Sequence, residues 1–378
     1  MIVLALIIAI AIFVFWAILE ADIHWFWKLG LVLAEMITVN QIFIRRYRMP
    51  SEIGLVLIKS KKGIDLIERL SKSDRTFKFL SDVGNSIAYG LSSIVITRKN
   101  RSFESVVIGM LLLGFLSLIV APNAFFIIAQ LLQIDTEGKA IASIPSGGLM
   151  VSIIGAFLLI GGIFLFVLFG IVLYGAIILK DIIDALFFGS SVILERDPGA
   201  HLLLPGVNLP FFEGIIALVV VMIMHEGAHA VLARIGKIPV QSSGIVLFGV
   251  IPVGAFVEPD ESRLRKADDM RQTRVLVAGC TSNLITSGIV FLLFAALVIG
   301  MNATGLTENA ALGFLRTTLG LTFALNFIVG AINLLPLPVF DGYRLLEVNI
   351  KNRLILSAVM YVTLAAFILN ILPWFFRG

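Results

Sequence analysis

The chain contains a series of uninterrupted apolar runs, and these constrain its fold more than any other feature. Each run is close to the roughly 20 residues that an α-helix needs to cross a hydrocarbon core. A soluble domain carries roughly 25% charged residues, whereas this chain is 14% charged and 59% hydrophobic. A soluble core cannot hide that much apolar surface. The runs occupy residues 2–19, 29–44, 106–132, 149–179, 215–233, 275–299, 313–335 and 354–375.

The stretch between the second and third runs, residues 46–104, is the most polar part of the chain and is rich in Lys and Arg. Its segment 63–79 spaces apolar residues among charges, which is typical of an amphipathic helix on a membrane surface or of a small cytosolic helical subdomain. A solvated linker is the alternative. The run that begins at residue 149 is longer than one span requires, so it predicts one tilted helix or two tightly turned passes.

Charge and cysteine content exclude several classes of site. The net charge of +4 matches the Lys and Arg that flank membrane spans, so we expect no nucleic-acid partner. The single cysteine, Cys280, excludes an intrachain disulfide and a cysteine-rich zinc site. Two of the four histidines, His24 and His201, lie in polar stretches outside the runs, which leaves His225 and His229 as the candidates for a metal site.

The run at 215–233 carries the motif His225-Glu226-x-x-His229. Histidines four positions apart share one face of a helix, so both can reach one Zn²⁺, and the intervening glutamate can serve as a general base. Hydrogen-bonded core histidines, or histidines at a helix interface, are the alternative. Ionisable groups are costly at membrane depth, and a bound metal ion would compensate for that cost. The location in an apolar run therefore favours a zinc site.

A zinc site of this kind needs a third protein ligand, and the sequence offers two carboxylates for it. Asp341 follows an apolar run that Pro336 and Pro338 interrupt, and an unwound segment there could bring its carboxylate to the metal. A helix end that Asp341 caps is the alternative. Glu258 is the other candidate, but it stands beside further acidic residues in a polar stretch, which is typical of a solvated position. We therefore predict Asp341 as the third ligand.

The run at 275–299 contains the small residues Ala278, Gly279 and Cys280, followed by Asn283. Small residues allow two membrane helices to approach each other closely. Asn283 carries an amide group to membrane depth, where it needs a partner. It could hold a substrate carbonyl or stabilise an oxyanion. An interhelical hydrogen bond is the alternative.

These three motifs together resemble the site-2 proteases, the zinc intramembrane metalloproteases of peptidase family M50. That family combines HExxH, matched at His225–His229, with an A-G-x-x-x-N element, matched at Ala278–Asn283. Its third motif, N-x-x-P-x-x-x-[LF]-D-G, is matched at Asn333–Gly342. The resemblance covers about residues 200–350. Within it, residues 204–208 and 249–258 are similar to archaeal members in particular.

Two departures from the family pattern are visible. Phe340 precedes Asp341, where leucine is commoner. The loop after Met301 is too short for a PDZ-like insert, so the resemblance implies no size filter of that kind.

The resemblance implies a zinc-dependent endopeptidase that cuts within or near transmembrane segments of other membrane proteins. It implies one Zn²⁺ per chain held by His225, His229 and Asp341, with Glu226 as general base and Asn283 as a further catalytic residue. Residues 242–257 resemble the family's membrane-associated β-hairpin near the active site, whose strand edge could pair with an unwound substrate. The fold class is therefore an all-α, polytopic membrane protein: a transmembrane helix bundle with one small β-hairpin.

The resemblance also implies an organisation and an orientation. We expect a multi-pass protein of a prokaryotic plasma membrane, in contact with the bilayer and its transmembrane substrates, with the site open to the cytosol. The loop 235–274 is rich in Lys and Arg, as a cytosolic loop should be. If 46–104 is also cytosolic, the topology requires two passes within 149–190. The expected regions are N-terminal spans (1–45), a basic polar or amphipathic region (46–104), further spans (105–199), the catalytic membrane core (200–350) and a C-terminal helix (351–378).

Two other functions stay open at this point. A membrane zinc protease of the prenyl-protein-processing type would use a glutamate such as Glu258 as its third ligand. A metal transporter or an inactive scaffold would hold zinc without catalysis. Glu226 argues against the second alternative, because holding zinc does not require it.

Overall fold

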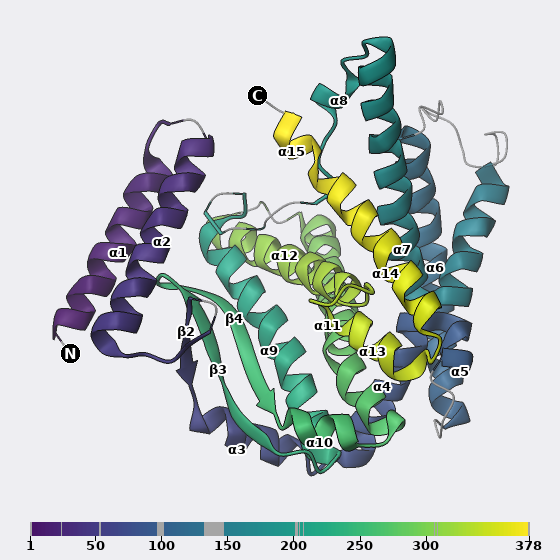
Figure 1. The fold of residues 1–378 in the computed structure, drawn as a ribbon, viewed down its shortest axis with the longest axis horizontal. Coiled ribbons are helices and arrows are strands. Elements are labelled where there is room, and N and C mark those ends of the chain that lie inside the picture. Colours follow the sequence, from purple (N-terminus) through teal and green to yellow (C-terminus); the bar gives the residue numbers. More distant parts are fainter. Residues whose placement is uncertain are drawn as a thin grey trace. The chain divides into compact units, whose positions relative to one another are not determined.

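The computed structural model describes residues 2–376 apart from 24, 53, 97–101, 132–146, 201–202, 204, 207, 306 and 308. His24 and His201 lie outside the described residues, as do Leu204 and Val207 of the segment similar to archaeal proteins. Nine of the described helices are long and apolar enough to cross a membrane, and a small antiparallel sheet accompanies them. The predicted class, a polytopic helical membrane protein with a small β element, is therefore confirmed (Figure 1).

The chain divides into two compact units, each assembled from three segments. Residue 73 ends the first segment of unit 1, so the basic region 46–104 is shared between the units. Unit 1 comprises Met1–Ser73, Leu202–Lys266 and Ile285–Ile328; unit 2 comprises Asp74–His201, Ala267–Leu284 and Val329–Gly378.

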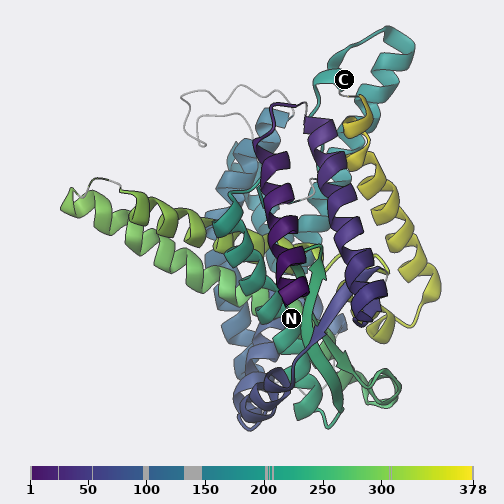
Figure 2. The ribbon, with the colours of Figure 1, turned by 90° about the vertical axis from the view of Figure 1, so that its left-hand side faces the viewer.

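Unit 1 begins with two apolar helices, α1 (Ile2–Glu20) and α2 (Trp25–Tyr47), which lie side by side (Figures 1 and 2). Many large apolar side chains of α1 are exposed, as lipid-facing side chains would be, whereas most of those of α2 are buried or half-buried. One buried cluster joins these helices to the first strands of the sheet. Its buried members are Ala11, Val39, Phe43 and Val56.

The sheet of unit 1 has four antiparallel strands in the order β1-β2-β3-β4. The predicted hairpin at 242–257 forms its second half, joined at Gly249, which has a positive φ of 62°. The Gly249 amide donates to the Asn40 side chain of α2 (2.8 Å). Residues 51–59 add two strands that the sequence analysis did not predict. The strands are β1 (Ser51–Glu52), β2 (Leu55–Lys59), β3 (Val240–Phe248) and β4 (Ile251–Pro259).

Helix α9 (Phe211–Ile235) packs along β4, and the short helix α3 (Lys61–Leu70) packs against α9 and β3 (Figure 1). Ile67 is the buried residue of α3, and Glu68 forms an ion pair with Arg234 near the end of α9. The amphipathic helix predicted within 63–79 is thus two helices, of which only α3 belongs to unit 1. Helix α10 (Glu261–Lys266) follows β4.

Unit 2 begins with α4 (Asp74–Tyr89), followed by the 3₁₀ turn η1 (Gly90–Ser92) and α5 (Ser93–Ile96). Every residue from Ser81 to Tyr89 is buried. Together these elements qualify as a candidate membrane span by length and composition, although the sequence analysis placed them in the basic polar region. Helix α6 (Phe103–Leu131) follows and packs against α4.

Helix α7 (Gly147–Phe188) has two limbs rather than one straight axis. Gly162 has non-helical backbone angles (φ 64°, ψ −161°). The rings of Phe157 and Phe169 lie 5.1 Å apart, whereas a straight helix would separate these positions by about 18 Å. The chain therefore folds back at Gly162, as two turned passes would require.

The C-terminal helix α14 (Arg353–Ile371) packs against α7. Gly175 allows this approach, and the Asn370 amide donates to the Ile171 carbonyl (3.0 Å). A buried ion pair of 2.6 Å joins Asp181 on α7 to Arg196. The short helices nearby are α8 (Val192–Glu195) and α15 (Pro373–Phe376).

Helices α11 (Asp269–Thr304) and α12 (Ala310–Ile332) contribute residues to both units and run side by side (Figure 2). In unit 1, the Ser287 hydroxyl donates to the Phe323 carbonyl (3.0 Å). In unit 2, the two helices approach each other closely at Gly330. The chain then continues through an irregular segment into α13 (Asp341–Asn349).

Candidate metal centre

Helix α9 carries His225, Glu226 and His229 within a stretch apolar enough to span a membrane. The two histidine Nε2 atoms lie 3.2 Å apart, and the rings are inclined at 74°. His225 is buried, whereas Glu226 and His229 are half-buried. The two imidazoles therefore converge beside one face of the helix, as the four-residue spacing predicts.

The distance between these nitrogens fits two ligands of one zinc ion. Zn–N bonds of 2.0–2.1 Å in a tetrahedral site place neighbouring ligand nitrogens about 3.3 Å apart. The 3.2 Å separation of the Nε2 atoms is close to that value. A hydrogen bond between two neutral imidazoles has a similar length, so the identity of the third group decides between the two interpretations.

Asp341 is the first residue of α13 and follows an irregular segment. Helix α12 ends at Ile332, and residues 333–340, which contain both prolines, are not helical. This interruption is the one that Pro336 and Pro338 predict. The N-cap position of α13 belongs to Phe340, so a capping role does not account for the Asp341 carboxylate.

Gly342 fixes the geometry of this segment. Its amide donates to the Asn333 carbonyl (2.7 Å), which closes the loop. A Cβ atom at Gly342 would lie 2.0 Å from the Leu334 carbonyl oxygen, so no other residue fits. Leu334 and Leu335 anchor the loop in the core, because both are fully buried. The Asp-Gly pair thus places a carboxylate beside a tightly packed turn.

His225, His229 and Asp341 each offer one ligand atom, and these three atoms all lie within 4.8 Å of one another. Within the part of the chain that the structure describes, they form the one group of three such side chains close enough to hold a metal ion. Two imidazole nitrogens and a carboxylate oxygen are ligands typical of catalytic zinc sites, which leave a fourth position for water. The donor set therefore fits zinc.

Asn283 lies on α11 and is fully buried. A Cβ atom on Gly330 of α12 would lie 3.1 Å from Asn283 Cβ and 3.1 Å from the Cys280 carbonyl oxygen. The close approach of α12 to α11 at this point depends on Gly330, because a side chain there would meet Asn283 and the Cys280 carbonyl. The role of Asn283 toward a substrate stays a prediction.

Glu258, the other candidate ligand, has partners of its own on the sheet. The Ser242 hydroxyl donates to its carboxylate, and Lys59 forms an ion pair with it at 3.3 Å. The Ser242 hydrogen bond, and then Lys59, hold the pKa of Glu258 below its usual value. Glu258 does not belong to the described metal-ligating group. These contacts favour Asp341 over Glu258 as the third ligand.

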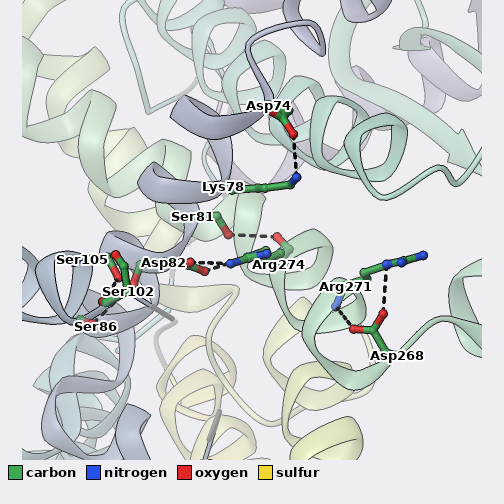
Figure 3. Close-up of polar contacts among 10 residues, drawn as sticks. All are labelled: Asp74, Lys78, Ser81, Asp82, Ser86, Ser102, Ser105, Asp268, Arg271 and Arg274. Atoms are coloured by element: carbon green, nitrogen blue, oxygen red, sulfur yellow. Dashed lines mark hydrogen bonds and ion pairs between the residues drawn. The ribbon is translucent and has the colours of Figure 1, made fainter. Parts of the chain in front are cut away.

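A polar interface between α4 and α11 was missed by the sequence analysis (Figure 3). The Arg274 guanidinium donates to both carboxylate oxygens of Asp82, at 2.9 and 2.6 Å. The Ser81 hydroxyl donates to the Arg274 carbonyl (3.3 Å). Helical spacing is the signal that could have revealed this interface, because several polar residues share one buried face of α4. They are Ser81, Asp82, Asn85, Ser86 and Tyr89.

Comparison with known proteins identifies the family. The model of peptidase family M50 matches residues 213–372, which include all three candidate ligands. An uncharacterized protein of Methanocaldococcus jannaschii is 40% identical over 80 residues, which cover 21% of this chain and 22% of that protein. The "Putative zinc metalloprotease YwhC" of Bacillus subtilis is 32% identical over 150 residues, which cover 35% of this chain and 67% of that protein. No solved structure matches. The chain belongs to peptidase family M50, the site-2-type zinc metallopeptidases.

Proposed function

We propose that the protein is a zinc-dependent intramembrane endopeptidase, which hydrolyses peptide bonds within or near transmembrane segments of membrane proteins. The observation that carries the proposal is the group of His225, His229 and Asp341. Two of these residues lie on α9, a helix long and apolar enough to span the bilayer. Metal ligands on a membrane helix would act on a substrate that also lies in the membrane. Their position on α9 therefore supports a transmembrane segment as the substrate.

The proposed chemistry assigns a role to each residue of the centre. His225, His229 and Asp341 would hold a zinc ion, which would supply Lewis-acid activation of a water molecule for attack on a peptide carbonyl. Glu226 accepts the proton of the water and transfers it to the leaving amine nitrogen. Asn283 holds the substrate carbonyl through its buried amide group and stabilises the developing oxyanion.

Strand β4 offers a docking edge for the substrate. It pairs with β3 on one side and with no other strand among the described residues, and it packs along α9. Backbone hydrogen bonds shield the peptide bonds of an intact helix, so a substrate helix has to unwind before hydrolysis. Addition of the unwound segment to β4 would replace the hydrogen bonds that unwinding breaks.

We also propose that the protein lies in the plasma membrane of a prokaryote, with its active site open to the cytosol. The fold-back of α7 at Gly162 returns the chain to the side where α7 begins, which supports the topology that keeps residues 46–104 cytosolic. This topology requires that the candidate span Asp74–Ile96 does not cross the membrane completely. The segment after α9 is rich in basic residues, as a cytosolic segment should be. They are Lys237, Arg263, Arg265, Lys266, Arg271 and Arg274.

Cleavage of a defined membrane substrate tests the proposal. Purified protein in detergent is incubated with a model single-span protein, before and after treatment with a zinc chelator and after zinc is restored. We expect cleavage that the chelator abolishes and zinc restores, with mass spectrometry placing the cut in or next to the span. Cleavage confined to soluble parts of the substrate, or cleavage that persists in the zinc-depleted protein, would refute the proposal.

A further inference from the structure

Asn40, in the second half of α2, is a buried polar residue that the proposed mechanism does not use. Its side chain is 1% exposed, and both ends of its amide group bind the sheet. The Gly249 amide donates to Asn40 Oδ1 (2.8 Å), and Asn40 Nδ2 donates to the Gly54 carbonyl (2.9 Å). One asparagine thus joins α2 to two turns of the sheet, the turn between β1 and β2 and the turn between β3 and β4.

Both turns have glycine at the point where Asn40 binds them. Gly54 has a φ of 81° and Gly249 a φ of 62°, a region that glycine adopts readily and other residues rarely. The approach at Gly249 is also close, because a Cβ atom there would lie 3.1 Å from Met36 Cα on α2. The turn of the β3–β4 hairpin therefore lies directly on the backbone of α2, and Asn40 holds it there.

The backbone pairing within the hairpin is weak near this turn. The register of the β3–β4 pairing shifts after the pair Val246–Gly254, and such a shift locally disrupts the ladder of hydrogen bonds. On the turn side of the shift, Pro252 has no N–H group, so it cannot donate to the ladder. The position of the turn therefore depends on contacts outside the hairpin, and Asn40 supplies a hydrogen bond of that kind.

The two ends of the hairpin determine where β4 lies along the metal-binding helix α9 (Figure 1). At the turn, Ile251 of β4 belongs to one apolar cluster with Phe211, the first residue of α9. At the base, the Ile238 amide, two residues before β3, donates to the Ala233 carbonyl near the end of α9 (2.9 Å). Both histidines of the metal centre lie between these two points on α9.

We propose that Asn40 is a positioning residue for the substrate, which holds β4 at a fixed place along the metal-binding helix. The inference rests on the proposed function, in which an unwound substrate segment adds to the free edge of β4. Such a segment pairs with β4 residue by residue, so the position of β4 decides which peptide bond lies at the metal centre. Successive residues of a strand are about 3.3 Å apart, and a displacement of that size moves the cut to a neighbouring bond.

Asn40 lies outside the segment that the family model matches, residues 213–372. The docking strand and the histidines belong to that segment, whereas the residue that holds the turn belongs to α2. The N-terminal part of this chain therefore sets the position of the cut without contributing a metal ligand.

The variant Asn40→Ala tests the inference, because it removes both hydrogen bonds. With a model single-span substrate, mass spectrometry should find additional cuts at bonds next to the principal wild-type site. We expect kcat/KM at the principal site to fall by about 10–100-fold, since a misplacement of about 1 Å can cost 10²-fold. The zinc content should stay at the wild-type level. If Asn40→Ala does not fold, Asn40→Gln keeps an amide group there but is one methylene longer, and it should displace the cut in the same way.

The matched control is Asn370→Ala. Asn370 is also buried and joins two elements, because its amide donates from α14 to the Ile171 carbonyl of α7 (3.0 Å). Both alanine variants lose a hydrogen bond between elements, so both should lower the melting temperature. Only Asn40→Ala should change the position of the cut.

The outcomes separate this inference from the proposed function. If the wild-type protein shows zinc-dependent cleavage and the Asn40 variants cut the same bond with the same kcat/KM, the positioning role is refuted and the proposed function stands. A wild-type protein without zinc-dependent cleavage would refute the proposed function itself. Equal changes of the cut in Asn370→Ala would overturn the inference, because general destabilisation would then be the cause. Loss of zinc from Asn40→Ala would overturn it too, because the change would then act on the metal centre.

Discussion

Replacement of Arg274 by methionine should destabilise the protein, because it leaves the Asp82 carboxylate buried without its ion-pair partner. The guanidinium of Arg274 makes two charge-assisted hydrogen bonds to Asp82, of 2.6 and 2.9 Å (Figure 3). The side chains of Arg274 and Asp82 are 21% and 7% exposed, so water can solvate the remaining carboxylate only poorly. Methionine keeps most of the apolar stem of the arginine, so the change removes mainly the charged group.

The expected magnitude follows from this burial. The loss of one partner of a buried ion pair costs about 3–5 kcal/mol. Because Arg274 keeps some contact with solvent, we expect the lower end, about 3 kcal/mol, which is roughly a 100-fold change in the folding equilibrium. The double variant Asp82→Leu with Arg274→Met leaves no unpaired charge in the interior. It should therefore cost less than either single change.

Denaturant unfolding in detergent, followed by circular dichroism, measures these differences for the wild-type protein, both single variants and the double variant. Lys78→Met is the control, because it breaks an exposed ion pair of 2.7 Å with Asp74 on the same helix. It should change stability little, as exposed pairs usually do. Single variants as stable as the wild-type protein would refute the reasoning. A double variant whose loss equals the sum of the two single losses would refute it as well, because independent side chains behave that way.

Three further predictions concern the metal centre. His225→Ala and His229→Ala should each strip zinc from a protein that otherwise holds about one ion per chain, and elemental analysis that finds full occupancy in either variant would contradict the ligand assignment. Glu226→Gln should retain zinc while cleavage of a transmembrane substrate falls by at least about 10²-fold, and normal turnover would exclude Glu226 as the general base. Asp341→Ala should weaken zinc binding and abolish cleavage, whereas Glu258→Ala should retain zinc, and the opposite pair of results would favour the glutamate-ligand class of protease.

The parts of the centre that depend on local geometry could be predicted from the sequence. Two histidines four positions apart share a helix face whatever surrounds them, and their Nε2 atoms do converge to 3.2 Å. Two prolines only two positions apart disrupt helical hydrogen bonding, and α12 does end before them, at Ile332. The third ligand lies 112 positions beyond His229 (341 − 229), and no local rule connects the two. Only the combination of motifs indicated Asp341.

The elements that the sequence did not reveal depend on partners far along the chain. A hydropathy scale scores Asp82 as unfavourable in a membrane helix. It takes no account of Arg274, which lies 192 positions away and neutralises the charge of Asp82. Strand β2 is short and lies among charged residues, and it is stable because Val56 pairs opposite Leu247 in β3. No proline or polar turn residue in the sequence marks the point at which α7 folds back. Gly162 makes the turn within an otherwise apolar sequence, because glycine alone readily adopts a φ of 64° there.

The N-terminal part of this chain belongs to the structural core of the enzyme, although the family model matches only residues 213–372. Within that segment, β3 pairs with β4 on one side. On its other side it pairs with β2, through Val56–Lys59. Arg274 depends on Asp82 for its counter-charge. Without residues 51–89, the matched segment would have an unpaired strand edge and a largely buried arginine without its counter-charge, and both are costly. The first part of the chain therefore supplies contacts that stabilise the fold of the matched segment.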